Sequence, residues 1–290
     1  MDDKVNPYIK SLSSGTAIIC EMTTGGLFME NLKMEKQRTS KPYPDIVKRV
    51  LGQGIKGFEA GLLPWGVTVG LTKGMALGGS HSYIKNKCNE HGLSKTATGN
   101  IAGFGSGAFQ GFCIAPLQLA RIRVNEVVAT RPKPGTWGEE IKMSATILND
   151  VIKKNGIRSL FTGMGTTMTK RSFDWGLRFG IKSQLDSQLE KHNLHNVHMA
   201  NVGSAFASGT ISAFITMPID RTIPLLQSSS GGNFVSLLKQ KIAKEGYSTL
   251  FRGYGIRAIS TGYHTTFALF VSDAFYKGAM KLNNDANGKL

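Results

Sequence analysis

The chain has 290 residues, and its 35 Lys and Arg outnumber its 19 Asp and Glu to give a formal net charge of +16. This excess predicts attraction to a polyanion, either nucleic acid or an anionic lipid surface. Cys20, Cys88 and Cys113 are odd in number and widely spaced, which argues against a disulfide framework and against a cysteine metal site.

Hydropathy alone would place the chain in water, because mean hydropathy is −0.11 and no window reaches roughly eighteen uninterrupted apolar residues. Small residues nevertheless recur every fourth position in three segments, the third being weaker. They are Gly66, Gly70, Gly74 and Gly78, then Gly99, Gly103, Gly107 and Gly111, and then Ala205, Gly209 and Ala213. In water each helical glycine costs about 0.8–1.0 kcal/mol relative to alanine, whereas in a bilayer the spacing lets helices pack closely. The pattern favours membrane helices over glycine-rich loops.

Three repeats of one plan follow each other, at about residues 8–92, 93–194 and 195–284 of a single domain spanning 1–290. In each repeat a long apolar segment ends in a kink motif. A polar stretch, a short helix and a second long segment follow, so the sequence predicts three similar helical hairpins.

The kink motif is degenerate in the first repeat, where Phe28 opens residues 28–33, and begins with proline at 116–121 and 218–223. Proline inside a helix removes one backbone hydrogen bond and bends the axis. The short helices end in nonapeptides that share a glycine at the second and last positions: residues 53–61, 155–163 and 245–253.

At these motifs the chain resembles the mitochondrial carrier family, from about Ser11 to about Lys281. The resemblance implies an all-α membrane protein with six transmembrane helices in a threefold pseudosymmetric barrel and three short helices on the matrix side. It also implies a multi-pass protein of the mitochondrial inner membrane that is a transporter and not an enzyme.

The resemblance further implies a ring of ion pairs that closes the matrix side. Glu30 would pair with Arg121, and Asp220 with Lys33. The third pair of positions is uncharged: Gln118 and Ile223. Three amides occupy positions where the family braces the ring: Gln37, Asn125 and Gln227. The alternative is that these are solvated helix-end residues, but two complementary pairs favour a weakened ring.

The corresponding outer ring is hard to find. Its positions fall at residues 80–84, which carry no pair, at 182–186, where the polarity is reversed, and at 272–276, which keep only the acid Asp273. The sequence therefore predicts little means of closing the outer side.

Substrate contacts of the family carry over to three pairs of positions: Thr68 and Val69, Lys170 and Arg171, and Ser260 and Thr261. Adjacent cations at bilayer depth require a water-filled cavity or a partner, and the resemblance associates such a pair with carboxylate or phosphate substrates. Five further polar residues lie on the same even-numbered helices: Lys73, Asp174, Arg178, Arg257 and His264. Asp174 lies within one turn of Lys170 and Arg171, so it alternatively neutralises them.

The resemblance also implies bound cardiolipin, an anionic lipid, at the ends of the matrix helices, and no other cofactor. Phe251, Arg252 and Gly253 fit the family's lipid motif, and Gly163 is the equivalent glycine of the second repeat. Helix N-termini after these glycines present free N–H groups to a phosphate. Nucleic-acid modules and metal-site spacings are not recognisable, and His192, His195 and His198 fall in a polar connection.

Two functions from different classes remain. The first is exchange of a small anionic metabolite across the inner membrane by alternating access. The second is a carrier-like structural subunit of a larger, respiratory-type inner-membrane complex that no longer transports. Phe28 and the empty outer ring favour the second, as would a lumen plugged by side chains; the retained matrix pairs and the Lys170–Arg171 pair favour the first.

Overall fold

The computed structural model describes residues 5–30, 32, 42–52, 65–128, 137–193, 198–228, 239, 242–243, 246–251 and 253–287. All regular structure within these ranges is helical, which confirms the predicted all-α class. In chain order the elements are α1 (Pro7–Glu21), η1 (Met22–Gly26), α3 (Tyr43–Gly52), α5 (Val67–Glu90), α6 (Lys95–Val128), α7 (Trp137–Asn155), η3 (Ile157–Phe161), α8 (Met164–Lys191), α9 (His198–Ser228), η4 (Tyr247–Phe251), α11 (Tyr254–Thr266), η5 (Phe267–Val271) and α12 (Ser272–Asn287).

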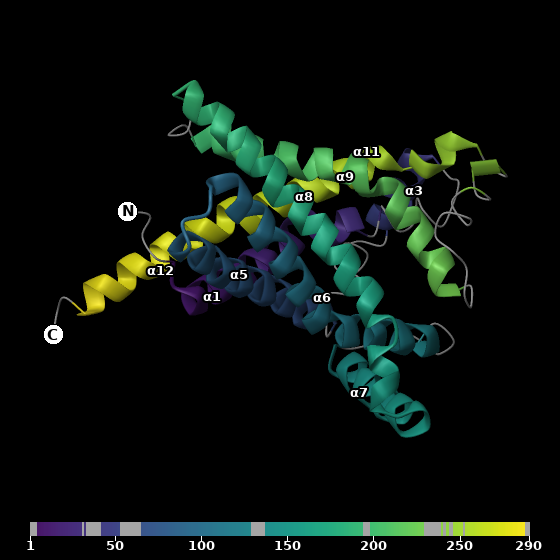
Figure 1. Ribbon diagram of the computed structural model, residues 1–290. Helices are drawn as coiled ribbons and strands as arrows, with labels where there is room; N and C mark the ends of the chain where they lie inside the picture. The colour runs from purple at the N-terminus through teal and green to yellow at the C-terminus, as the bar shows by residue number, and fades with distance from the viewer. Residues whose placement is uncertain are drawn as a thin grey trace.

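The long helices form a closed ring of neighbours. Contacts run from α1 to α5, then to α6, α8, α9 and α11, and η5 and α12 return to α1. Both chain termini lie at one end of the molecule, whereas α3 and α7 lie at the opposite end (Figure 1). We call these the outer end and the inner end, respectively. The predicted third short helix falls largely outside the described residues.

The glycine ladders lie where helices cross most closely. A methyl group on Gly111 of α6 would lie 2.6 Å from the Cα of Met168 in α8, and one on Gly74 of α5 would lie 2.8 Å from the Cα of Gly15 in α1. Such distances are far inside van der Waals contact with backbone, so no side chain fits there. The predicted close approach of helix backbones is confirmed.

The first repeat bends by a different device from the other two. Helix α6 continues through Pro116, and α9 continues through Pro218. In the first repeat the interruption lies at Gly25, inside the π-helical segment η1, where φ is +142°. A residue with a side chain rarely adopts that conformation. Gly25 therefore breaks the helix three residues before Phe28, which occupies the proline position.

The connections into α8 and α11 have matching backbone conformations. Each passes through a glycine with positive φ, one 3₁₀ turn, and a second such glycine that precedes the next helix. The φ values are +73° at Gly156 and +75° at Gly163, and +77° at Gly246 and +82° at Gly253. The nonapeptide motif therefore encodes one repeated turn, since both of its glycines are in the left-handed region.

Large apolar side chains are exposed along the two longest helices. Those of α6 are Ile101, Phe109 and Phe112, and those of α9 are Phe206, Ile211, Phe214 and Ile215. A belt of this kind on the outside of a helical ring indicates an apolar neighbour. Across the described residues, none of the helices meets the combined length and hydropathy expected of a membrane-crossing segment.

Candidate functional site

A cavity of about 170 Å³ lies inside the ring, and we call it the inner cavity. Its walls come from α1 and η1, α5, α6, α8 and α11. Its lining residues are Ile18, Glu21, Met22, Gly26, Glu30, Val69, Gly70, Lys73, Gln118, Arg121, Lys170, Arg171, Asp174, Arg178, Arg257, Ser260, Thr261 and His264. Parts of the chain from all three predicted repeats therefore meet there.

Positive charge dominates the inner cavity. Its cations are Lys73, Arg121, Lys170, Arg171, Arg178 and Arg257, and its acids are Glu21, Glu30 and Asp174. Six cations against three acids leave an excess of three positive charges among the lining residues that the structure describes. A concave site with low-dielectric walls concentrates this field, so the cavity attracts a small anion.

Most predicted substrate-contact residues lie in this cavity. Lys170 and Arg171 line it from α8, and Ser260 and Thr261 line it from α11. Thr68 is exposed and does not line the inner cavity, although the next residue on α5, Val69, does. The two cations and the two hydroxyls therefore face one space from different helices, and their roles stay predictions.

One of the two predicted matrix pairs can be followed to the inner cavity. Glu30 and Arg121, predicted partners, both line the inner cavity, as does the uncharged Gln118. The remaining gate residues lie outside the described residues or have side chains outside them: Lys33, Gln37, Asn125, Asp220 and Gln227. The ring as a whole stays a prediction.

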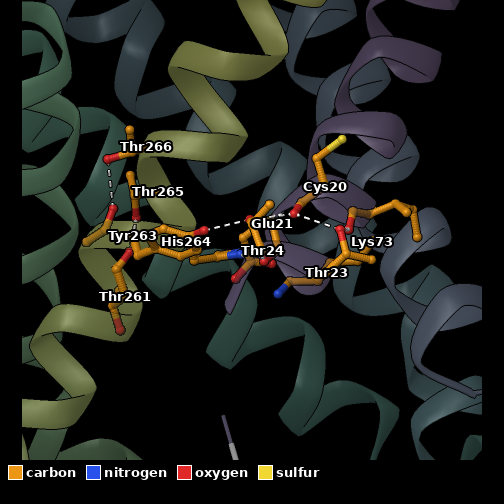
Figure 2. Close-up of polar contacts among 12 residues, drawn as sticks. Cys20, Glu21, Thr23, Thr24, Lys73, Thr261, Tyr263, His264, Thr265 and Thr266 are labelled. Carbon is orange, nitrogen blue, oxygen red and sulfur yellow. Dashed lines mark hydrogen bonds and ion pairs between the residues drawn. The ribbon is translucent and has the colours of Figure 1, made fainter. Parts of the chain in front are cut away.

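A buried acid–histidine pair was missed by the sequence reasoning. Oε2 of Glu21 in α1 lies 3.4 Å from Nδ1 of His264 in α11 (Figure 2). The two residues are only 6% and 8% exposed. Nε2 of His264 is also buried and has no hydrogen-bond partner among the described residues. The pair joins the first and third repeats, so no short-range spacing in the sequence could predict it.

A hydroxyl contact joins the two helices that carry this pair, and a π-helical segment lies in each of them next to the pair. Oγ1 of Thr24 lies 2.6 Å from the Tyr263 hydroxyl, and Lys73 of α5 lies on the other side of Glu21 (Figure 2). The π-helical segment η1 begins directly after Glu21, and η5 begins three residues after His264. Such segments are rare and concentrate at functional sites.

An apolar layer closes the ring on the outer side of the inner cavity, and we call it the central layer. Its members are Ile18, Met22, Leu27, Leu77, Trp175, Ala205, Ala268, Leu269 and the adjoining Phe179. The Trp175 indole is 0% exposed and donates to Oε1 of Gln110 at 2.9 Å, while Nε2 of Gln110 donates to the Lys73 carbonyl at 2.9 Å. Through Gln110, these two bonds link Trp175 of α8 to α6 and α6 to α5.

Outside the central layer lies a second cavity of about 430 Å³, which we call the outer cavity. Phe179 and the stacked His81 ring, 3.8 Å away, lie at its floor. The charged residues in its walls are Lys10, Lys85, Lys95, Lys182, Asp186, Glu190 and Asp273. The structure therefore has two separate cavities that contain charged residues, one on each side of the central layer.

An ion pair that the sequence did not predict links two helices at the outer end. Lys10 of α1 forms an ion pair with Asp273 of α12, and Ser14 lies 2.9 Å from Ser272 between the same helices. The backbone N–H of Asn6 donates to the Tyr276 hydroxyl at 2.9 Å. Weak closure of the outer side therefore stays a prediction, with this one pair added to the acid Asp273 that the sequence predicted there. The cation that pairs with Asp273 lies on α1, the first helix, and not in the same helix segment as the family's outer motif would place it.

The predicted lipid residues keep the expected backbone. Gly163 and Gly253 precede α8 and α11, and the Phe251 ring stacks on Phe214 with centroids 5.0 Å apart. Arg252 lies outside the described residues. Lipid binding there stays a prediction. Within the described chain, no cluster of His, Cys, Asp and Glu is suited to hold a metal ion.

Comparison with known proteins finds several carriers with low sequence identity to this chain. A citrate/oxoglutarate carrier protein of Saccharomyces cerevisiae is 27% identical over 180 residues, which cover 60% of this chain and 55% of that protein. The succinate/fumarate mitochondrial transporter of the same organism is 22% identical over 223 residues, covering 70% of this chain and 68% of that protein. The mitochondrial oxaloacetate transport protein of Schizosaccharomyces pombe is 24% identical over 304 residues, covering 97% and 94%.

The match therefore spans about half the length of the first relative and almost the full length of the third. The family model described as mitochondrial carrier protein matches residues 94–193 and 195–282, which together exceed half of this chain. These matches agree with the repeat motifs and the helical ring. The chain belongs to the mitochondrial carrier protein family.

Proposed function

We propose that this chain exchanges a small anionic metabolite across the mitochondrial inner membrane by alternating access. The observation that carries the proposal is the inner cavity, where the cations of Lys170 and Arg171 and the hydroxyls of Ser260 and Thr261 line one space. Charge-assisted hydrogen bonds from the cations would hold the anion, and the hydroxyls would complete its coordination. The exposed apolar belt on α6 and α9 supports six helices embedded in lipid.

The charge of the cavity narrows the substrate class. Its excess of three positive charges matches an anion of two or three charges. The relatives named above are carriers of citrate and oxoglutarate, of succinate and fumarate, and of oxaloacetate, all carboxylates. We therefore propose a di- or tricarboxylate as the substrate.

The alternative, a structural subunit that does not transport, rested partly on the absence of an outer ring. The Lys10–Asp273 pair ties α1 to α12 at the outer end, and the central layer fills the lumen between the two cavities. The central layer does fill the lumen at one level, but cavities lie on both sides of it. A carrier with one side shut has this arrangement, so these observations support transport.

The test is uptake by purified protein in liposomes that contain cardiolipin, with labelled citrate, oxoglutarate, succinate, fumarate and oxaloacetate as the panel. Each bond from a charged donor is worth about 1.5–3 kcal/mol, so Lys170→Ala with Arg171→Ala should lower uptake more than about tenfold. Lys191→Ala is the matched control, because Lys191 ends the same helix and lines neither cavity.

Uptake that is equal in the wild type and the double variant would refute the assigned site. No uptake of any panel member, together with co-purification in a large complex, would support the structural alternative.

A further inference from the structure

We infer that Glu21 and His264 form the binding site for a proton that crosses the membrane together with the anion. This inference rests on the proposed transport function, and it assigns a second, coupled cargo to the inner cavity. Both residues line that cavity, and both are almost completely buried between α1 and α11.

The geometry identifies the nitrogen that takes the proton. Nδ1 of His264 faces the Glu21 carboxylate at 3.4 Å, so Nδ1 carries the hydrogen of the neutral ring. Nε2 is then the basic nitrogen, and it is buried without a hydrogen-bond partner among the described residues. A buried polar atom of this kind needs an explanation. A proton binding at Nε2 provides one, since it converts the ring to an imidazolium next to a carboxylate.

The surrounding charges link proton binding to anion binding. The charged groups that act on His264 are Glu21 of α1, Lys73 of α5 and Arg178 of α8. Asp174 of α8 and Arg257 of α11 lie in the same cavity wall, and α9 contributes no described lining residue. While no anion is bound, the excess of positive charge in the cavity disfavours protonation of His264. An anion that enters cancels this excess, so each ligand raises the affinity for the other.

The helix interruptions provide a route for release. The π-helical segments η1 and η5 lie in the two helices that carry the pair, and Thr24 joins Tyr263 beside it. Movement that separates α1 from α11 parts His264 from the carboxylate that stabilises its charge. The proton then leaves Nε2 for water on the side to which the anion is released. Only one N–H bond forms at uptake, and the same bond breaks at release.

The experiment measures protons and anions together. Liposomes containing the wild-type protein and a trapped pH-sensitive dye, but no internal carboxylate whose export would carry protons out, receive labelled citrate or succinate, and the ratio of internal acidification to net anion uptake is recorded. The wild type should give about one proton for each anion. The His264→Gln variant keeps the size and polarity of the side chain but does not titrate, so the ratio should fall at least tenfold whatever its uptake rate.

The matched control is His81→Gln. His81 is the other described histidine with a buried Nε2 that lacks a partner, but it lies beside the outer cavity. Its replacement should leave the proton-to-anion ratio unchanged. Wild-type uptake without acidification, or equal ratios in the wild type and His264→Gln, would overturn the inference.

A second measurement separates the two proposals. If neither citrate nor succinate enters liposomes preloaded with the same anion, transport of these anions is refuted. Citrate is then added to detergent-solubilised protein in weakly buffered solution, and proton uptake is followed with a pH indicator. Uptake by the wild type that is lost in His264→Gln supports the linked site without transport, and absence of uptake overturns it.

Discussion

The inner and outer cavities lie on opposite sides of one apolar layer, but they use charge differently. In the outer cavity three of the four lysines pair with acids: Lys10 with Asp273, Lys95 with Glu190, and Lys182 with Asp186. In the inner cavity the cations outnumber the acids two to one. Two of the outer pairs join different helices and one lies within α8. The difference indicates that most outer charges neutralise one another, whereas the inner charges are arranged for a ligand.

The largest effect is expected at the layer that separates the two cavities. Trp175→Ala removes a fully buried indole and the hydrogen bond to Gln110, so it should destabilise the protein by about 3–5 kcal/mol. It should also join the cavities and allow an uncoupled leak. Thermal unfolding in detergent and anion efflux without a counter-substrate measure the two effects.

Phe173→Ala is the matched control, because Phe173 lies on the same helix and is 48% exposed. If it leaks as much as Trp175→Ala, the central layer is not the barrier.

The next prediction compares two lysines of α5, one in each cavity. Lys73→Gln removes a cationic side chain from the inner cavity, so it should weaken the apparent affinity for citrate about tenfold. Lys85→Gln removes a cation from the outer cavity and should change the apparent affinity for citrate less than about twofold. Thermal-shift titration with citrate gives both values.

Equal losses in these two variants would mean that the anion also binds in the outer cavity. The functional distinction between the two spaces would then be wrong.

The smallest effect concerns the closure of the outer end. Asp273 is largely exposed, with a side chain that is 64% accessible, and a pair of this kind contributes about 0.2–1 kcal/mol. A double-mutant cycle with Lys10→Gln and Asp273→Asn should therefore give a coupling energy in that range, measured by unfolding. The same variants should alter the uptake rate by only a few-fold, because the central layer stays intact.

A coupling energy of zero, with unchanged uptake, would show that Lys10 and Asp273 do not help to close the outer end. The central layer would then be the barrier by itself.

Local patterns predicted much of the architecture. The glycine spacing predicted close approach of helix backbones, and Gly74 and Gly111 confirm it. The nonapeptide motifs predicted three equivalent turns, and the two that the structure describes, completed by Gly163 and Gly253, have matching conformations. The family resemblance placed Lys170 and Arg171 seven and eight residues after Gly163, and both line the inner cavity. These predictions succeeded because helix period and glycine conformation depend on residues close together in the chain.

The chain's own sequence therefore determined its class, its repeated hairpins and the cationic side of its cavity. Only the tertiary structure decided which charges meet across the ring. Lys10 and Asp273 are 263 positions apart, and Glu21 and His264 likewise come from the first and third repeats. The break at Gly25 was not predicted either, because the degenerate proline motif placed the kink at Phe28. Contacts between distant segments have no period in the sequence, because they depend on how whole helices pack.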